Sequence, residues 1–442
     1  MAVSSIDGRY RQTTECLSSC FSEYALFKDR IFIEIEYFKY LSNMRLPQLP
    51  SLNNQQLHDI DYIYHNFDIE ECMIIKNIEK KTKHDVKAVE YYLQQKFTEI
   101  NLDKYISFIH FGLTSQDINT SSNMIGMVRA LNIINKYLAS LICELDKMIH
   151  KYKNIVMLSR THGQPAVPTT VGKELNVFKY RLTKEISTLS NIKIYTKFGG
   201  AVGNCNSHKV AYPTIDWNKE FDKFVETLDL HRSQVTTQID NYDTIASVLD
   251  CVKRINCIII DLNVDMWLYI SLKYFKQNVA KGEIGSSTMP QKVNPINFEN
   301  SEGNLIIAIS LLECISRKLP VSRMQRDLTD STILRNLGSA FGHCIIGYTS
   351  TINGLKKVDV NVDVLNEDLE NNYSIITEAL QTILRREGLD NAYEQLKNLT
   401  LNHDKLNKNI IGDFINKLNV TDSIKQELKE INVFNYVGYS IN

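Results

Sequence analysis

Residues 285–295, which read GSSTMPQKVNP, combine more polar and reactive side chains than a simple connection needs. Ser286 and Ser287 follow a glycine, at which the backbone bends freely. Lys292 can bind a carboxylate through its charge, and the amide of Asn294 can donate to the same kind of oxygen. Two prolines exclude a helix interior. We therefore expect a loop that binds an anion, with a helix-linking turn capped by serines as the structural alternative.

A second polar loop spans 159–170 and reads SRTHGQPAVPTT. His162 stands in it between polar neighbours, next to Gly163 and close to two prolines. A histidine in such a loop more often titrates or binds a ligand, whereas one on an apolar helix face usually belongs to the core. We therefore expect His162 to act in proton transfer or binding, with a purely structural role as the alternative.

A third loop, HFGLTSQD at 110–117, precedes a predicted helix. Thr114, Ser115 and Asp117 fit an N-cap followed by an acidic first turn. The start of a helix also presents free N–H groups, which suit an anion. We expect the capping role and, in addition to it, a role in binding a ligand.

The fourth polar segment, SRMQRDLTDSTILR at 322–335, places Arg326, Ser331 and Arg335 at spacings of five and four. In a straight helix with about 3.6 residues per turn, the two arginines would lie on opposite sides and could not bind one phosphate. Either the chain breaks near Asp330, or the arginines serve different groups. A solvated surface is the further alternative.

Long helices must hold these loops, and the distribution of proline favours such helices. Prolines are absent from 51–164, from 214–289 and from 321–442. Between Val252 and Ile270, apolar residues recur at steps of three and four, and they also occupy the other sides. Such a helix belongs either to an ordinary core or to a core that subunits share.

The same spacing predicts helices over 115–155, 168–198 and 296–318. The sequence contains no Asn-Gly turn between two runs of alternating apolar and polar residues, so no β-hairpin is predicted. Gly388 and Gly412 are expected to interrupt the helices near the C-terminus. The fold class is therefore predicted to be mainly α.

Composition excludes several classes of protein. The 442 residues carry a formal net charge of −1, which argues against nucleic-acid binding through bulk charge. No apolar run is long enough for a membrane helix, and the first residues lack the apolar segment of a secretory signal. The nine scattered cysteines form no CxxC pair, which fits free thiols in a reducing compartment. We expect a cytoplasmic protein without a metal site, a nucleic-acid partner or a membrane.

Together, the polar loops resemble the signatures of the fumarase/aspartase superfamily and, within it, of the adenylosuccinate lyase family. Residues 285–295 match the superfamily pattern GSSxMPxKxNP at every fixed position. Many relatives have histidine where Gln291 stands, but that position is not fixed. The other matching segments are SSIDGRY at 4–10, KHDVKAVEYYL at 83–93, SRTHGQPA at 159–166, GAVGN at 200–204, TTQI at 236–239 and LPVSRMQRDLTDSTILRN at 319–336. The resemblance therefore covers nearly the whole chain.

The resemblance implies three helical domains, with boundaries at 1–110, 111–363 and 364–442. The central domain would be a bundle of long helices that forms the core of a homotetramer. Each active site would be assembled from loops of three different subunits. The implied reaction releases fumarate from adenylosuccinate, giving AMP, and from the succinyl-carboxamide ribotide SAICAR, giving AICAR, in purine biosynthesis. The implied partner is this small nucleotide substrate, and no cofactor is implied.

The resemblance also assigns the catalytic residues. Ser286 would remove the proton bonded to carbon, and His162 would protonate the leaving nitrogen. Lys292 and Asn294 would stabilise the charge that develops on a carboxylate, and Glu299 would orient His162. The implied substrate-binding residues are Arg9, Tyr10, His84, Asp85, Thr114, Ser115, Thr161, Gln238, Met289, Arg326, Ser331 and Arg335.

Other interpretations stay open at this point. Argininosuccinate lyase and aspartase share the signature loop, although the DGRY start and SRTHGQPA favour a nucleotide substrate. A catalytically silent structural relative has no need to keep Ser286, His162, Lys292 and Glu299 together. A helical interaction scaffold would explain the long helices but not the four polar loops.

Overall fold

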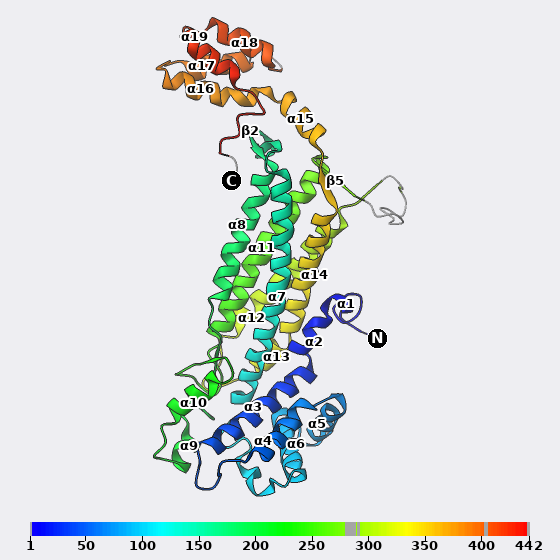
Figure 1. The fold of residues 1–442 in the computed structure, drawn as a ribbon, viewed down its shortest axis with the longest axis vertical. Coiled ribbons are helices and arrows are strands. Elements are labelled where there is room, and N and C mark those ends of the chain that lie inside the picture. Colours follow the sequence, from blue (N-terminus) through cyan, green and yellow to red (C-terminus); the bar gives the residue numbers. More distant parts are fainter. Residues whose placement is uncertain (1, 279–288, 290–291, 402–404, 440–442) are drawn as a thin grey trace. The chain divides into compact units, whose positions relative to one another are not determined.

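Helices dominate the fold, as predicted (Figure 1). The computed structural model describes residues 2–278, 289, 292–401 and 405–439. The chain divides into two units, each with its own internal contacts. Unit 1 comprises Met1–Leu138, Glu185–Cys257 and Gly303–Thr349, and unit 2 comprises Ala139–Lys184, Ile258–Glu302 and Ser350–Asn442.

Five long helices contribute residues to both units, because the boundaries between the units fall within them. They are α7 (Ser115–Tyr152), α8 (Val171–Ser190), α11 (Asp243–Ser271), α12 (Ile296–Lys318) and α14 (Leu337–Lys356). The predicted helices over 115–155, 252–270 and 296–318 are confirmed. The helix predicted over 168–198 is present but shorter, because residues 168–170 belong to β2 and α8 ends at Ser190.

The remaining helices of unit 1 are distributed over all three of its segments. They are α1 (Arg11–Thr14), η1 (Glu15–Leu17), α2 (Ser18–Phe21), α3 (Glu23–Asn43), α4 (Asn54–His65), α5 (Ile69–Thr82), α6 (Asp85–Glu99), η2 (Asp103–Phe108), α9 (Asn206–Ala211), α10 (Trp217–Glu226) and α13 (Thr329–Leu334). Those of unit 2 are α15 (Val362–Asn371), η3 (Tyr373–Ile376), α16 (Thr377–Arg386), α17 (Ala392–Leu401), α18 (Lys408–Lys417) and α19 (Asp422–Glu430).

The described strands form three small two-stranded sheets. Antiparallel pairing joins β1 (Val156–Thr161) to β2 (Gln164–Thr170) and β5 (Phe275–Gln277) to β6 (Val358–Val360). The strands β3 (Tyr195–Thr196) and β4 (His231–Arg232) are parallel.

The β1–β2 hairpin contradicts the prediction that no hairpin is present. Its register pairs Thr161 with Gln164, so His162 and Gly163 form a two-residue loop with φ of 54° and 73°. Two-residue hairpin loops often need positive φ at both positions, and Asn-Gly is only the commonest way to supply it. The His-Gly pair supplies both positive φ angles here, so the absence of Asn-Gly does not exclude a hairpin.

The two glycines that were expected to interrupt helices behave differently. Gly388 follows α16 with φ of 80°, as expected for a residue that ends a helix. Gly412 lies inside α18, so the predicted break there is wrong. Ile411 and Ile415 on this helix are buried, and their packing outweighs the cost of about 1 kcal/mol of an internal glycine.

In unit 2, the long helices are joined by a buried polar triad. Asn263 of α11 donates to the Ser301 hydroxyl of α12 at 2.8 Å, and Thr351 of α14 lies within hydrogen-bond distance of both, at 2.8 Å from Ser301 and 3.0 Å from Asn263. All three residues are fully buried, so each polar group depends on the other two for its hydrogen bonds. The triad fixes the register of the three helices against one another.

None of the described helices combines the length and the apolar character that crossing a bilayer requires. The division into three domains with boundaries at 1–110, 111–363 and 364–442 stays a prediction.

Candidate active site

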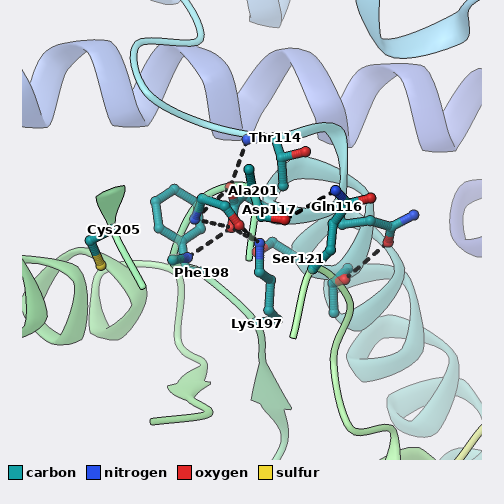
Figure 2. A network of polar contacts seen from close by, with 12 residues as sticks. Thr114, Gln116, Asp117, Ser121, Lys197, Phe198, Ala201 and Cys205 are labelled. Atoms are coloured by element: carbon teal, nitrogen blue, oxygen red, sulfur yellow. Dashed lines mark hydrogen bonds and ion pairs between the residues drawn. The ribbon is translucent and has the colours of Figure 1, made fainter. Parts of the chain in front are cut away.

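The Thr114–Asp117 turn of unit 1 begins helix α7. The Asp117 carboxylate accepts a hydrogen bond from the Thr114 N–H through Oδ2, at 2.8 Å, which is the predicted closure of the first turn. Its Oδ1 accepts hydrogen bonds from Lys197 Nζ at 2.6 Å and from the Gly199 N–H at 2.8 Å (Figure 2). The predicted capping acid therefore also binds a loop about 80 residues further along the chain.

The loop with the sequence GAVGN, which begins at Gly200, is packed against the TTQI segment. A Cβ atom at Gly203 would lie 2.3 Å from the Thr236 carbonyl oxygen, and the φ of Gly203 is 78°. Only glycine allows this close approach. Gln238 donates to the Ala201 carbonyl at 3.0 Å and accepts from Arg326 at 3.4 Å. Residues from three predicted segments therefore meet in unit 1.

Buried partners also hold the backbone immediately before Thr114. Glu34 of α3 accepts from the His110 N–H at 3.1 Å and lies 2.5 Å from His110 Nδ1. Burial by itself would lower the pKa of His110, but the charge and hydrogen bond of Glu34 outweigh it, so the pKa is raised. The Phe111 carbonyl accepts from the Tyr37 hydroxyl at 3.2 Å and lies 3.0 Å from His208 Nε2. Burial lowers the pKa of His208 to about 4.

The chain breaks before α13, which settles the question that the two arginines raised. Helix α13 begins only at Thr329, whose N–H donates to the Asp327 carboxylate at 2.8 Å. Arg326 lies before this break, whereas Ser331 is in the helix and Arg335 is its C-cap. The opposed-face geometry of a continuous helix therefore does not apply.

Ser331 and Arg335 line a cavity of about 260 Å³ in unit 1. Asp85 lies in its wall and accepts from the guanidinium of Arg30 at 2.7 Å. The attraction of Arg30 outweighs partial burial and lowers the pKa of Asp85. Buried Arg30 keeps its Nε without a hydrogen-bond partner. Glu23 and Glu79 also lie in this wall, so Arg30 and Arg335 stand among three carboxylates. The free Nε of Arg30 is the donor that remains for an anion.

Three of the polar residues around this cavity were not predicted: Arg30, Gln116 and Asn119. Arg30 lies in the middle of a helix whose sequence reads as core, so no motif marks it. Gln116 and Asn119 follow the predicted Thr114–Ser115 pair within one turn of α7, and that spacing could have indicated them. His84, which was predicted, is the N-cap of α6 and accepts from the Lys87 N–H at 3.2 Å.

The N-terminal segment lies close to the same region of unit 1. A second cavity of about 250 Å³ is lined by Asp7, Arg11 and also Arg335. Arg9 and Tyr10 stand between the first two of these residues, and the Arg9 guanidinium lies 5.8 Å from the centre of the Tyr10 ring.

In unit 2, His162 lies at the exposed tip of the β1–β2 hairpin, directly after Thr161. Glu299, in the first turn of α12, is also exposed and accepts from the indole N–H of Trp267 at 3.0 Å. No hydrogen bond or ion pair joins His162 to Glu299 within the described residues. One chain by itself therefore leaves the predicted acid without the carboxylate that was expected to orient it.

The signature loop is described only in part. Ser286 and Ser287 lie outside the described residues. Met289 and Lys292 are exposed, and the Lys292 N–H donates to the Met289 carbonyl at 3.0 Å. Asn294 is half-buried and precedes α12. Within the described residues, no three His, Cys, Asp or Glu side chains converge as metal ligands would.

Comparison with known proteins identifies the family of this chain. Residues 8–308 match the family described as lyase, and residues 322–437 match the family described as adenylosuccinate lyase C-terminal. The chain is 49% identical to adenylosuccinate lyase of Dictyostelium discoideum, over 99% of this chain and 96% of that protein. It is 43% identical to adenylosuccinate lyase of Escherichia coli strain K12, over 100% and 97%.

Solved structures agree at the level of the fold. Fumarate lyase from Mesorhizobium sp. BNC1 has a TM-score of 0.76 at 16% identity, over 96% of this chain and 95% of that one. The 3-carboxy-cis,cis-muconate lactonizing enzyme from Pseudomonas putida has the same TM-score at 19% identity, over 96% and 94%. The solved structures establish only the fold, whereas the sequence identity to adenylosuccinate lyases over nearly the full length establishes the family. The chain belongs to the adenylosuccinate lyase family, a family of carbon–nitrogen lyases.

Proposed function

We propose that the chain cleaves adenylosuccinate to AMP and fumarate, and SAICAR to AICAR and fumarate. The observation that carries this proposal is the identity of 43–49% to adenylosuccinate lyases over nearly the whole chain. The cavity lined by Arg335, Ser331 and the buried Arg30 supports it, because a nucleotide phosphate needs such donors. Arg9, Tyr10, His84, Asp85 and Arg326 complete the proposed binding of the nucleotide part.

The reaction breaks a C–N bond β to a carboxylate. Ser286 removes the proton from carbon, and the electrons move onto the neighbouring carboxylate. Lys292 and Asn294 bind the resulting charge, which is usually the largest contribution to such catalysis. Since an ammonium and an amide supply this stabilisation, the mechanism requires no metal ion.

His162 donates the proton that the leaving nitrogen needs. An imidazole titrates near neutral pH, and a neighbouring carboxylate such as Glu299 supports its charged form. Thr114, Ser115 and Gln238 hold the succinyl part, with Thr161 and Met289 at its edge. The fixed backbone around Thr114 and the bond from Gln238 to Ala201 support this assignment.

The enzyme is a homotetramer in this proposal, and each active site takes loops from three subunits. Helix α11 supports it, because Trp267 and Leu268 are 42% and 46% exposed while Leu262 and Met266 on its other side are fully buried. Exposed apolar side chains of this size on one helix face are typical of an interface. Glu299 is hydrogen-bonded to Trp267 and so lies on this face, where a second subunit could bring His162 to it.

A cytoplasmic location belongs to the proposal as well. It is supported by the nine cysteines, all of which lie in the described residues as free thiols.

The direct test incubates the protein separately with adenylosuccinate, SAICAR, argininosuccinate and aspartate and follows fumarate by its absorbance. We expect release from the first two substrates only. Release from argininosuccinate or aspartate alone would contradict the proposal, and release from none would indicate a catalytically silent relative.

A further inference from the structure

The Asp117 carboxylate joins two loops that come from distant parts of unit 1. Its side chain and that of Lys197 are completely buried, and Asp117 is in contact with four different donors. One donor, the Thr114 N–H, belongs to the start of α7. The other three belong to the Lys197–Gly200 segment (Figure 2). A simple helix cap would need only the first of these contacts.

Lys197 also forms a hydrogen bond with the backbone of its own loop, at Gly200. Its ammonium group donates to Asp117 Oδ1 and to the Gly200 carbonyl, both at 2.6 Å. Burying two opposite charges costs free energy that their attraction does not always offset. An ordinary capping residue is exposed and avoids this cost, so the burial indicates a need for fixed geometry.

Hydrogen bonds connect this loop to Gln238 and Arg326, two of the proposed substrate-binding residues. The residue after Gly200 is Ala201, whose carbonyl accepts from Gln238, and Gln238 in turn accepts from Arg326. Gly200 itself has a φ of 76°, and a Cβ atom there would lie 3.3 Å from the Gly112 carbonyl oxygen. The two loops are therefore in direct contact, and Asp117 lies at their junction.

We propose that Asp117, together with Lys197, is a positioning residue that fixes the distance between the Thr114–Ser115 turn and Gln238, so that both bind the succinyl part of one substrate molecule. This inference rests on the proposed function. It predicts that loss of the carboxylate weakens substrate binding even in a protein that remains folded. An entirely structural pair would instead contribute to stability alone.

The experiment compares Asp117→Asn, Lys197→Met and the double variant with the wild-type tetramer. In Asp117→Asn, the amide nitrogen must face a donor, because both carboxylate oxygens accept hydrogen bonds. We expect both single variants to have lowered Tm. The double variant should regain part of the loss of Lys197→Met, because no buried charge is left unpaired, although its amide nitrogen still faces a backbone N–H. We expect KM for adenylosuccinate to rise at least tenfold in Asp117→Asn and in the double variant, with a smaller change in kcat.

The control is Asp29→Asn, which breaks another ion pair of unit 1, between the buried Asp29 and the partly exposed Arg129. It should lower Tm and leave KM unchanged. Lys197→Arg keeps the charge and is the milder variant if the others do not fold; its larger head group should raise KM about threefold to tenfold.

A folded double variant that keeps the wild-type KM would overturn the positioning role of Asp117, as would a Lys197→Arg variant with unchanged KM. A wild-type protein that releases no fumarate from adenylosuccinate would contradict the proposed function instead. The two failures are therefore distinguishable.

Discussion

The Thr114–Asp117 turn of unit 1 and the His162 hairpin tip of unit 2 are built in opposite ways. The turn is held by buried side chains on both sides: Glu34 and Tyr37 bind the backbone just before Thr114, and Lys197 binds Asp117. The tip is exposed, and its histidine forms no hydrogen bond with the proposed partner Glu299. The substrate residues of the turn, Thr114 and Ser115, are therefore fixed within one chain, whereas the proposed acid is presented outwards.

This difference agrees with the proposed active site, in which one subunit binds the substrate and another supplies the acid. Binding residues gain from being held rigid before the substrate arrives, because less freedom is then lost on binding. A residue that completes the site of another subunit must instead be exposed in its own chain. Changes at the tip should consequently affect kcat most, and changes around the turn should affect KM or stability.

The largest expected effect comes from His162→Asn. Asparagine tolerates the positive φ of this position better than alanine, so the hairpin is kept while the acid is removed. We expect kcat to fall by about 10²–10⁴-fold, the usual contribution of one proton-transfer group, with KM within tenfold of wild type. Fumarate release at saturating substrate measures this change. A kcat within fivefold of wild type would remove His162 from the chemistry.

A mixing experiment tests whether the tip serves another subunit. His162→Asn and Ser286→Ala should each be nearly inactive alone, but subunit exchange between them should restore measurable fumarate release. Activity returns because some shared sites then contain neither substitution. Native mass spectrometry must first show that mixed tetramers form; if they do and the mixture stays inactive, the shared site is wrong.

The smallest effect concerns the pH dependence of stability around the turn. The raised pKa of His110 means that its pair with Glu34 stabilises the fold fully below the ordinary histidine pKa of about 6.5. This contribution is lost as the pH rises through the higher pKa of the folded state. His110→Asn should therefore lower Tm more at pH 6 than at pH 9. Asparagine again suits the positive φ of this position, and any remaining strain does not depend on pH. An equal loss at both pH values would contradict the assignment.

The sequence predicts the long helices well because their apolar spacing is local information. The limits of α12 at 296 and 318 are those predicted, and α7 begins at Ser115, the predicted start. The hairpin was missed because its turn uses His-Gly. Gly412 was misjudged because the burial of its neighbours, a tertiary effect, overrides the local preference.

The sequence predicts many residues of the candidate site, but it does not predict which of them contact one another. Asp117 reads as a capping acid from its local sequence, and nothing near it reveals that Lys197 is its partner. Arg30 reads as one charge in a core helix, although it lines the cavity with Arg335. Contacts across 80 residues or more depend on the fold, and a single sequence does not contain them.

The complete burial of the Asp117 carboxylate also affects how fast nearby backbone N–H groups exchange hydrogen with solvent. The N–H groups of Gly199 and Gly200 belong to a loop, where exchange is normally fast, yet both donate to a group that water does not reach. Their deuterium uptake requires local opening, so a peptide covering this loop should be protected almost like the helices around it. Loss of that protection would report loosening of the loop before the helices themselves unfold.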